Sequence, residues 1–256
     1  MKQPIYRLAL VTTLFACTYL ARLSAVPYDL TTAGSSALVN GALFQTTTLQ
    51  STGTGVIAPF LRLQGNGSEQ GLNSDSANND LFADTKFGAW THDVVLADLG
   101  IQAGFVGFLL DINQSSANPT LLFDTFKVYT RTGSITDGSQ DDLTDLDDAI
   151  LRYDLGANSL LLNYDLNPGS GGGDLLIFLP TSMFLGATLA DNLYVVAGFS
   201  GSNSGFEEFA TFGIDRPTPT TFSVPPVPDN ANTVLLLGAG MLGLLVASRK
   251  RATRAA

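Results

Sequence analysis

The chain has 256 residues, of which 23 are acidic, 13 are lysine or arginine and one is cysteine, so its formal net charge at pH 7 is −10. Residues 26–226 hold 22 of the acidic residues and six of the basic ones, which gives this part a net charge of −16. So acidic a surface excludes nucleic acid as a partner, because phosphate contacts need lysine and arginine. The single cysteine excludes a disulfide within the chain.

Residues 1–25 predict a secretory signal peptide. Lys2 and Arg7 precede the apolar run LALVTTLFACTYLA, and small residues lead up to Ala25. A basic start, an apolar centre and a small-residue end are typical of such a peptide, so we predict cleavage after Ala25. The alternatives are an uncleaved anchor and, from the sequence around Cys17, a lipid-modified cysteine.

Residues 26–213 predict one all-β domain, a β-sandwich or a jelly-roll-like fold. Short apolar runs alternate with Gly, Asn, Asp and Ser clusters, a spacing typical of sandwiches. Within the run Leu121–Thr130, residues Phe126–Thr130 alternate as a half-buried strand requires, whereas Leu175–Leu179 is apolar throughout and predicts a central strand. The runs are Val56–Leu63, Asp93–Leu99, Phe105–Ile112, Leu121–Thr130, Ala149–Asp154, Leu160–Tyr164, Leu175–Leu179, Leu193–Phe199 and Phe206–Phe212.

The segments between the runs predict loops and one helical turn. Gly65–Asp80 is polar and glycine-rich, which favours a mobile loop, and Pro180–Gly186 predicts one turn of helix. Asn167–Gly173 predicts a tight turn that joins its flanking strands as a hairpin. Residues 214–226 are rich in Pro and Thr and predict a stiff linker that spaces the domain from the C-terminal tail.

One segment, Asp137–Asp148, is a candidate calcium site because it holds six carboxylates in twelve residues. Crowded carboxylates can bind Ca²⁺, which takes six to eight oxygen ligands, although the segment does not match the EF-hand pattern. The candidate ligands are Asp141, Asp142 and Asp145. The alternative is a solvated acidic loop and short helix that points three apolar side chains inward: Leu143, Leu146 and Ile150.

No catalytic site is predicted, so we do not expect an enzyme. His92 is the sole histidine; no nucleophile motif accompanies it, a zinc site needs more nitrogen or sulfur ligands, and we interpret it as a surface or partly buried strand residue. Glu207 and Glu208 cannot flank one glycosidic bond, because adjacent strand residues point to opposite faces. Phe206 and Phe209 are interpreted as packing residues. Trp90 could stack on a sugar ring if it is exposed.

The tail, residues 227–256, predicts a short membrane-spanning helix. Thr233–Ala247 is uncharged and apolar and would be about 22 Å long as a helix, which is shorter than a bilayer core of about 30 Å. Snorkelling basic side chains and local thinning can close part of this gap. The basic residues that follow predict a cytoplasmic C-terminus, and they are Arg249, Lys250 and Arg251. A buried helix of a soluble domain is the alternative.

The tail resembles the PEP-CTERM type of sorting signal in its VPD form. The matching parts are the motif Val227, Pro228 and Asp229, the apolar stretch and the basic cluster. The tail departs from the commonest form because Asp229-Asn230 stands where Glu-Pro is usual. The resemblance implies recognition by a membrane-embedded exosortase, which cuts near the motif and releases or transfers the exported protein.

The body also resembles a group of exported PEP-CTERM proteins that have no assigned biochemical activity. The resemblance lies in segments such as FVGFLLDIN (105–113), FDTFKVYT (123–130) and GFEEF (205–209). It implies a precursor anchored in the inner membrane and a mature protein at the cell surface or in the extracellular matrix. We expect a structural or adhesive role, with exopolysaccharide as a candidate partner. The alternative is a carbohydrate- or calcium-binding module of the matrix.

Overall fold

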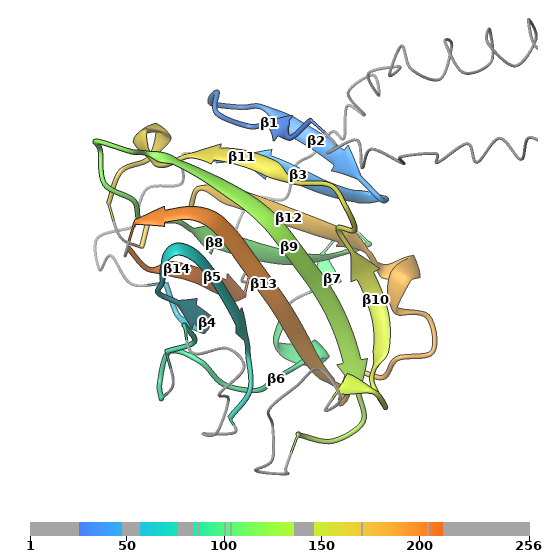
Figure 1. Ribbon diagram of the computed structural model, residues 1–256. Coiled ribbons are helices and arrows are strands. Elements are labelled where there is room, and N and C mark those ends of the chain that lie inside the picture. Colours follow the sequence, from blue (N-terminus) through green and yellow to red (C-terminus); the bar gives the residue numbers. More distant parts are fainter. Residues whose placement is uncertain are drawn as a thin grey trace, which may run out of the picture.

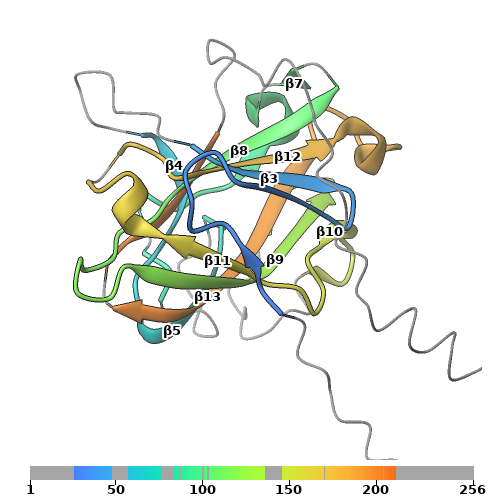
Figure 2. The ribbon, with the colours of Figure 1, turned by 90° about the horizontal axis from the view of Figure 1, so that it is seen from above.

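The computed structural model describes residues 26–47, 57–75, 84–86, 88–99, 101–102, 104–135, 146–169, 171–203 and 205–211. In this part of the chain, the regular structure consists of two seven-stranded sheets and three short 3₁₀ helices. The predicted all-β fold is therefore confirmed. The two sheets stack as layers, with the long curved strands β9 and β13 crossing one layer and β12 and β8 lying in the other (Figures 1 and 2).

The first sheet, sheet A, has a central pair of twelve-residue strands, β9 (Thr120–Arg131) and β13 (Asn192–Asn203). Its strand order is β1-β11-β9-β13-β5, with β10 on β9 and β6 on β13. All of its pairs are antiparallel except β1 with β11. The other strands are β1 (Tyr28–Asp29), β5 (Asn66–Leu72), β6 (Val94–Val95), β10 (Ile150–Asp154) and β11 (Leu160–Asn163).

The second sheet, sheet B, is built around β12 (Leu175–Pro180), which pairs with β3 on one side and β8 on the other. Its order is β2-β3-β12-β8-β14-β4, with β7 on β8. The other strands are β2 (Ser36–Val39), β3 (Ala42–Thr46), β4 (Pro59–Leu63), β7 (Ile101–Gln102), β8 (Phe105–Asp111) and β14 (Glu207–Thr211). The 3₁₀ helices are η2 (Leu96–Leu99), η4 (Tyr164–Leu166) and η5 (Thr181–Phe184).

The core between the sheets is dominated by phenylalanine. The ring of Phe123 stacks on Phe199 at a centroid distance of 4.8 Å within sheet A, and the ring of Phe126 stacks on Phe209 of sheet B at 5.9 Å. Such ring pairs add to the free energy gained by apolar burial. Because the Phe126–Phe209 contact joins β9 of one layer to β14 of the other, it helps to hold the two sheets face to face.

Most predicted strands form where the apolar runs lie. Residues Phe126–Thr130 alternate between buried and half-buried side chains, and β12 is buried on both faces, as its sequence predicted. The helical turn after β12 is η5. In contrast, Asp93–Leu99 holds only the two-residue strand β6 before η2 begins.

Two loop predictions were wrong. Residues 66–72, which we expected to be part of a mobile loop, form β5 and pair with β13 over seven residues. Asn167–Gly173 does not close a hairpin, because β11 before it belongs to sheet A and β12 after it belongs to sheet B. In both cases the polar, glycine-rich composition was compatible with a loop, and only the position of the partner strand decided the structure.

The outer face of sheet A is partly covered. Leu72, Tyr194 and Val196 form a small apolar cluster with Ile135 and Leu146 from the segments that flank residues 136–145. The prediction that Leu146 points inward is therefore confirmed, whereas Ile150 is 56 % exposed, so its predicted inward position was wrong. No other described residue of this cluster covers the next outward-facing positions along β5 and β13.

In the described segments between residues 26 and 211, no helix is long and apolar enough to cross a membrane. The predicted signal peptide, linker and sorting tail lie outside the described residues, as do residues 212 and 213 of the predicted domain. Their predictions therefore stay predictions.

Candidate functional site

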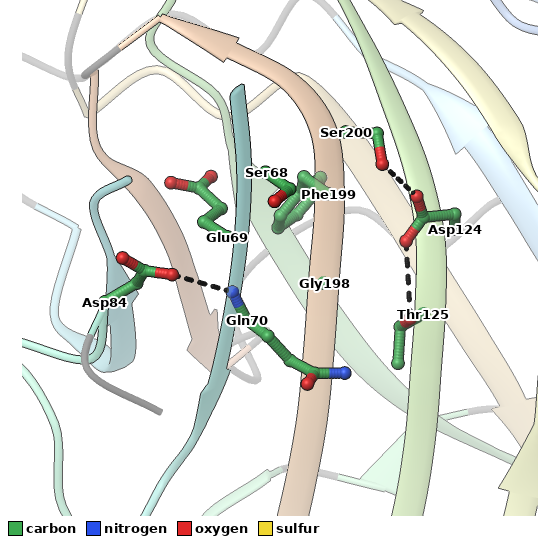
Figure 3. A pocket seen from close by; sticks show the side chains of 9 residues that line it. All are labelled: Ser68, Glu69, Gln70, Asp84, Asp124, Thr125, Gly198, Phe199 and Ser200. Carbon is green, nitrogen blue, oxygen red and sulfur yellow. Dashed lines mark hydrogen bonds between the residues drawn. The ribbon is translucent and has the colours of Figure 1, made fainter. Parts of the chain in front are cut away.

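A polar hollow of about 260 Å³ lies on the uncovered outer face of sheet A (Figure 3). We call it the Asp124 pocket. It begins two residues along each strand from the Leu72–Val196 pair. There Gln70 of β5 pairs with Gly198 of β13, and Ser68 pairs with Ser200. The residues that line it are Ser68, Glu69, Gln70, Asp84, Asp124, Thr125, Gly198, Phe199 and Ser200.

A β-bulge in β9 positions the central carboxylate. Gly198 pairs with Thr125, but the next residue, Phe199, pairs with Phe123, so Asp124 is an extra residue in its strand. A bulge changes the direction in which a side chain points. Here it places Asp124 and Thr125 together at the pocket, although neighbouring strand residues normally point to opposite faces.

Hydroxyl groups orient the Asp124 carboxylate. Ser200 Oγ donates to Asp124 Oδ2 at 2.6 Å, and Thr125 Oγ1 donates to Asp124 Oδ1 at 3.2 Å. Figure 3 shows the carboxylate held between these two side chains, one from β13 and one from β9 itself. A carboxylate oxygen has more than one acceptor site, so each oxygen can still accept a hydrogen bond from a ligand.

The opposite wall is supplied by β5 and by residue 84. Asp84 Oδ2 accepts the backbone N–H of Gln70 at 3.3 Å. The segment that contains Asp84 lies along β4 and the residue after it. Gln64 N donates to Asp84 O at 2.8 Å, and Lys86 N donates to Arg62 O at 2.9 Å. The pocket is therefore lined by three strands and by a segment that lies along β4.

The lining determines which ligands fit. Apart from Glu69, whose carboxyl group is buried against Glu207, it offers two carboxylates, three hydroxyl groups and the amide of Gln70, all groups that hydrogen-bond to hydroxyls. Its one aromatic ring, Phe199, is 1 % exposed and belongs to the core. The volume lies below the about 300–1,000 Å³ of sites for drug-sized ligands. The pocket thus suits one polar unit, such as a single residue of a hydroxyl-rich polymer.

Two glutamates meet inside the sandwich beneath this region. Glu69 of β5 and Glu207 of β14 are 4 % and 0 % exposed, and their carboxyl groups lie within hydrogen-bonding reach of each other. Glu69 Oε2 accepts the N–H of Gly65 at 2.5 Å, and Glu207 Oε1 accepts from the amide of Gln114. Glu69 Oε1 and Glu207 Oε2 have no other partner among the described residues. A proton shared between the two carboxyl groups would satisfy both oxygens.

Burial is also the main cause of the altered acidity of this pair. It raises the pKa of Glu207 well above the ordinary value, and the adjacent Glu69 carboxyl raises it further. The pKa of Glu69 is raised as well, again mainly by burial. Two like charges at such close range disfavour ionisation of both groups, so the pair holds a proton to higher pH than an exposed glutamate does.

A second carboxyl pair, Asp111 and Asp174, lies on the outer side of sheet B. Asp111 accepts the N–H groups of Gly171 and Gly173 at 2.7 and 3.3 Å, and Asp174 Oδ2 accepts Ile112 N at 2.8 Å. Burial raises the pKa of Asp174 to about 8, and Asp111 beside it adds to the shift. The pair fastens the glycine-rich segment before β12 to the end of β8, which is a structural role.

The sequence-derived candidates fall in different places. As expected, Glu207 and Glu208 do not act as a pair, because Glu207 contacts Glu69 and Gln114 whereas Glu208 forms an ion pair with Arg62. Phe209 packs in the core, but Phe206 is 37 % exposed. His92 is half-buried in the connection before β6, not in a strand, and does not line the Asp124 pocket.

The remaining predicted site residues lie outside the described residues. They are the calcium candidates Asp141, Asp142 and Asp145, the sorting motif Val227, Pro228 and Asp229, and the basic cluster Arg249, Lys250 and Arg251. In the part of the chain that the structure describes, no group of three or more His, Cys, Asp or Glu side chains could hold a metal ion. The calcium site stays a prediction.

Sequence reasoning missed the Asp124 pocket. Its residues come from four separate parts of the chain, and no short motif connects them. Comparison with known proteins found no matching family model, no matching curated protein and no matching solved structure. The function must therefore be argued from the chemistry of the site.

Proposed function

We propose that this chain is an exported protein of the cell envelope or extracellular matrix whose β-sandwich domain adheres to exopolysaccharide. In this proposal an exosortase sorts the precursor through its PEP-CTERM-like tail, and the mature domain holds a sugar unit of the polymer in the Asp124 pocket. The polar, open pocket on the face of sheet A is the observation that carries the binding part of the proposal.

The chemistry of the pocket supports a sugar ligand. A sugar ring presents several hydroxyl groups, each both a donor and an acceptor, and the pocket pairs oriented carboxylates with hydroxyl and amide groups. The acidic body, with a net charge of −16 over residues 26–226, would repel a polyanion. The favoured partner is therefore a neutral polysaccharide.

We propose binding and not catalysis at this site. Asp84 and Asp124 come from opposite walls of the pocket, and each is held by hydrogen bonds to its own wall. Carboxylates that are fixed in this way serve as acceptors for ligand hydroxyls. A general acid would need a carboxyl group that keeps its proton and faces the ligand, whereas the Glu69–Glu207 pair, whose pKa values are raised, is enclosed between the sheets.

The pocket is tested by replacing Asp124 with alanine in the full-length chain. Hydrogen bonds to charged groups contribute about 1.5–3 kcal/mol, so we expect the affinity for a neutral polysaccharide to fall roughly 10–100-fold. Affinity electrophoresis in gels that contain β-glucan, dextran or galactomannan measures this change. Asp165→Asn, an exposed position between β11 and β12, is the matched control. Equal mobility shifts for Asp124→Ala and the unmodified chain would rule the pocket out.

The sorting part of the proposal is tested in cells. When the exosortase gene is deleted, we expect a longer, membrane-bound precursor to accumulate, because the tail is no longer cut. Mass determination of the chain ends and fractionation of the envelope measure this. A double substitution, Pro228→Ala with Asp229→Ala, should give the same precursor in cells that keep the exosortase. Normal size and location in both cases would contradict the proposal.

A further inference from the structure

Trp90 and Phe206 form a second exposed feature, next to Arg62 of β4 at the edge of sheet B. The guanidinium carbon of Arg62 lies over the Trp90 ring at 3.7 Å from its centroid and over the Phe206 ring at 4.8 Å. The two aromatic residues are 41 % and 37 % exposed. We call these three side chains the Arg62 stack. Aromatic and arginine side chains dominate the energetics of recognition surfaces.

The backbone around Trp90 holds the ring in place. Trp90 lies in a turn that Thr91 N closes by donating to Gly88 O at 3.3 Å, and Gly88 adopts a positive φ of 90° there. Thr91 Oγ1 accepts Arg62 N at 3.1 Å, and His92 N donates to Phe60 O at 3.0 Å. The turn is thus fastened to β4 on its C-terminal side.

Phe206 and Arg62 are held as firmly. The amide of Asn113 donates to Phe206 O at 3.0 Å. Gly205 approaches Asn113 so closely that a Cβ would lie 1.4 Å from its carbonyl oxygen, so only glycine fits before Phe206. The Arg62 guanidinium binds the buried carboxylate of Glu208. The backbone at Phe206 and the guanidinium of Arg62 are therefore held in place before a ligand binds, which reduces the ordering that binding requires.

We propose that the Arg62 stack is a second sugar subsite, on which the exposed Trp90 and Phe206 side chains contact the apolar face of a neutral pyranose ring. The inference rests on the proposed function and deepens it by naming where a second unit of the polymer lies. One face of such a ring carries mainly C–H groups, which favour contact with an aromatic surface. A flat aromatic side chain supplies that surface and loses little rotational freedom on binding.

The electrostatics of the stack favour a neutral ring. Glu208 neutralises Arg62 within the stack, so no net positive charge is left to attract a uronic acid. The body as a whole is strongly acidic. An anionic polysaccharide is therefore repelled at long range and gains no compensating ion pair at this site.

One segment connects the two subsites. Asp84 lines the Asp124 pocket and Trp90 belongs to the stack, and six residues of chain extend over roughly 20 Å at most. A single polymer chain can therefore reach both subsites around the β4–β5 edge of the domain. Two linked contacts raise the overall affinity above that of either one, which suits an adhesive role.

Trp90 is the only tryptophan in the chain, so its fluorescence reports on the stack alone. We titrate the full-length chain with soluble β-glucan, dextran and galactomannan, with alginate as the anionic comparison. We expect a saturable change in Trp90 emission with at least one neutral polymer and none with alginate. Trp90→Ala should weaken binding of that polymer about tenfold by affinity electrophoresis, and Trp90→Phe should retain most of it. Leu185→Ala, at an apolar side chain that is 79 % exposed on η5's C-terminal flank, is the control.

The two proposals fail in distinguishable ways. If Asp124→Ala weakens binding while Trp90→Ala does not and the emission stays constant, the Asp124 pocket stands and the Arg62 stack is overturned. If none of the neutral polymers binds the unmodified chain, both proposals fall. If Trp90→Ala weakens binding as Asp124→Ala does, and circular dichroism shows both variants folded, the second subsite is supported.

Discussion

Replacing Glu207 with alanine is expected to destabilise the domain by roughly 3–5 kcal/mol. The substitution leaves the Glu69 carboxyl and the Gln114 amide buried without their partner, and it opens a cavity between the sheets. Each buried hydrogen-bonding group that loses its partner costs about 1–3 kcal/mol, and the unfilled volume adds to this cost. Urea unfolding of the full-length chain at pH 6, followed by Trp90 fluorescence, measures the difference.

The matched variant for this test is Glu207→Gln. Its amide has the shape of a protonated carboxyl and can donate to Glu69 as the shared proton does, so we expect it to lose less than half as much stability as Glu207→Ala. If the free energy of unfolding of Glu207→Ala lies within about 1 kcal/mol of that of the unmodified chain, the glutamate pair does not stabilise the contact between the two sheets and our interpretation is wrong.

Raising the pH from 5 to 9 is expected to destabilise the unmodified chain, and Asp174→Asn should remove the part of this effect that comes from Asp174. The pKa of Asp174 is raised to about 8 in the folded chain, so the folded state binds a proton that the unfolded state releases near pH 4. Stability from this proton is complete below about pH 4 and is lost as the pH rises through about 8. The loss amounts to roughly 3–5 kcal/mol, since one pKa unit corresponds to about 1.4 kcal/mol.

Urea midpoints at pH 5, 6.5, 8 and 9 measure this slope for the two forms. In Asp174→Asn the side-chain oxygen still accepts from Ile112 N and the amide donates toward Asp111, as the protonated acid does. The exposed carboxyls Asp29, Asp148 and Asp191, whose pKa values are lowered by hydrogen bonds, act at lower pH and leave this window unaffected. The other buried carboxyls with raised pKa values contribute a loss of the same sign in both forms, so the difference between the two slopes reports on Asp174; they are Glu69, Asp111, Glu207 and Glu208. An unchanged slope in Asp174→Asn would show that Asp174 does not carry the proton.

These buried acids explain why sequence reasoning about the glutamates was incomplete. The alternation rule placed Glu207 and Glu208 on opposite faces, which the structure confirms through their separate partners. It could not show that both are buried, since glutamate is almost never buried unless paired. Their partners, Glu69 on β5 and Arg62 on β4, lie far from residues 207 and 208 in the sequence. No local sequence pattern indicates that these strands come close to β14.

One hairpin has a clear local signal in the sequence. Asn40-Gly41 stands between the apolar segments Ser36–Val39 and Ala42–Thr46, and Asn-Gly between such segments is the strongest short-range hairpin signal. Both residues have positive φ values, 49° and 86°, and β2 pairs with β3 around them. This hairpin could have been predicted, whereas β5 could not, because its sequence NGSEQGL is polar and becomes a strand through its pairing with β13.

The sequence by itself determined the fold class and most strands, because apolar runs of strand length must be buried and their alternation shows which side chains enter the core. The export hypothesis also comes from the sequence alone, because it depends on the order in which basic, apolar and small residues follow one another near each end. The tertiary structure alone decided the candidate sites. Asp84, Asp124 and Ser200 meet because strand pairing and one bulge bring distant segments together, and Arg62, Trp90 and Phe206 meet at the edge of sheet B for the same reason.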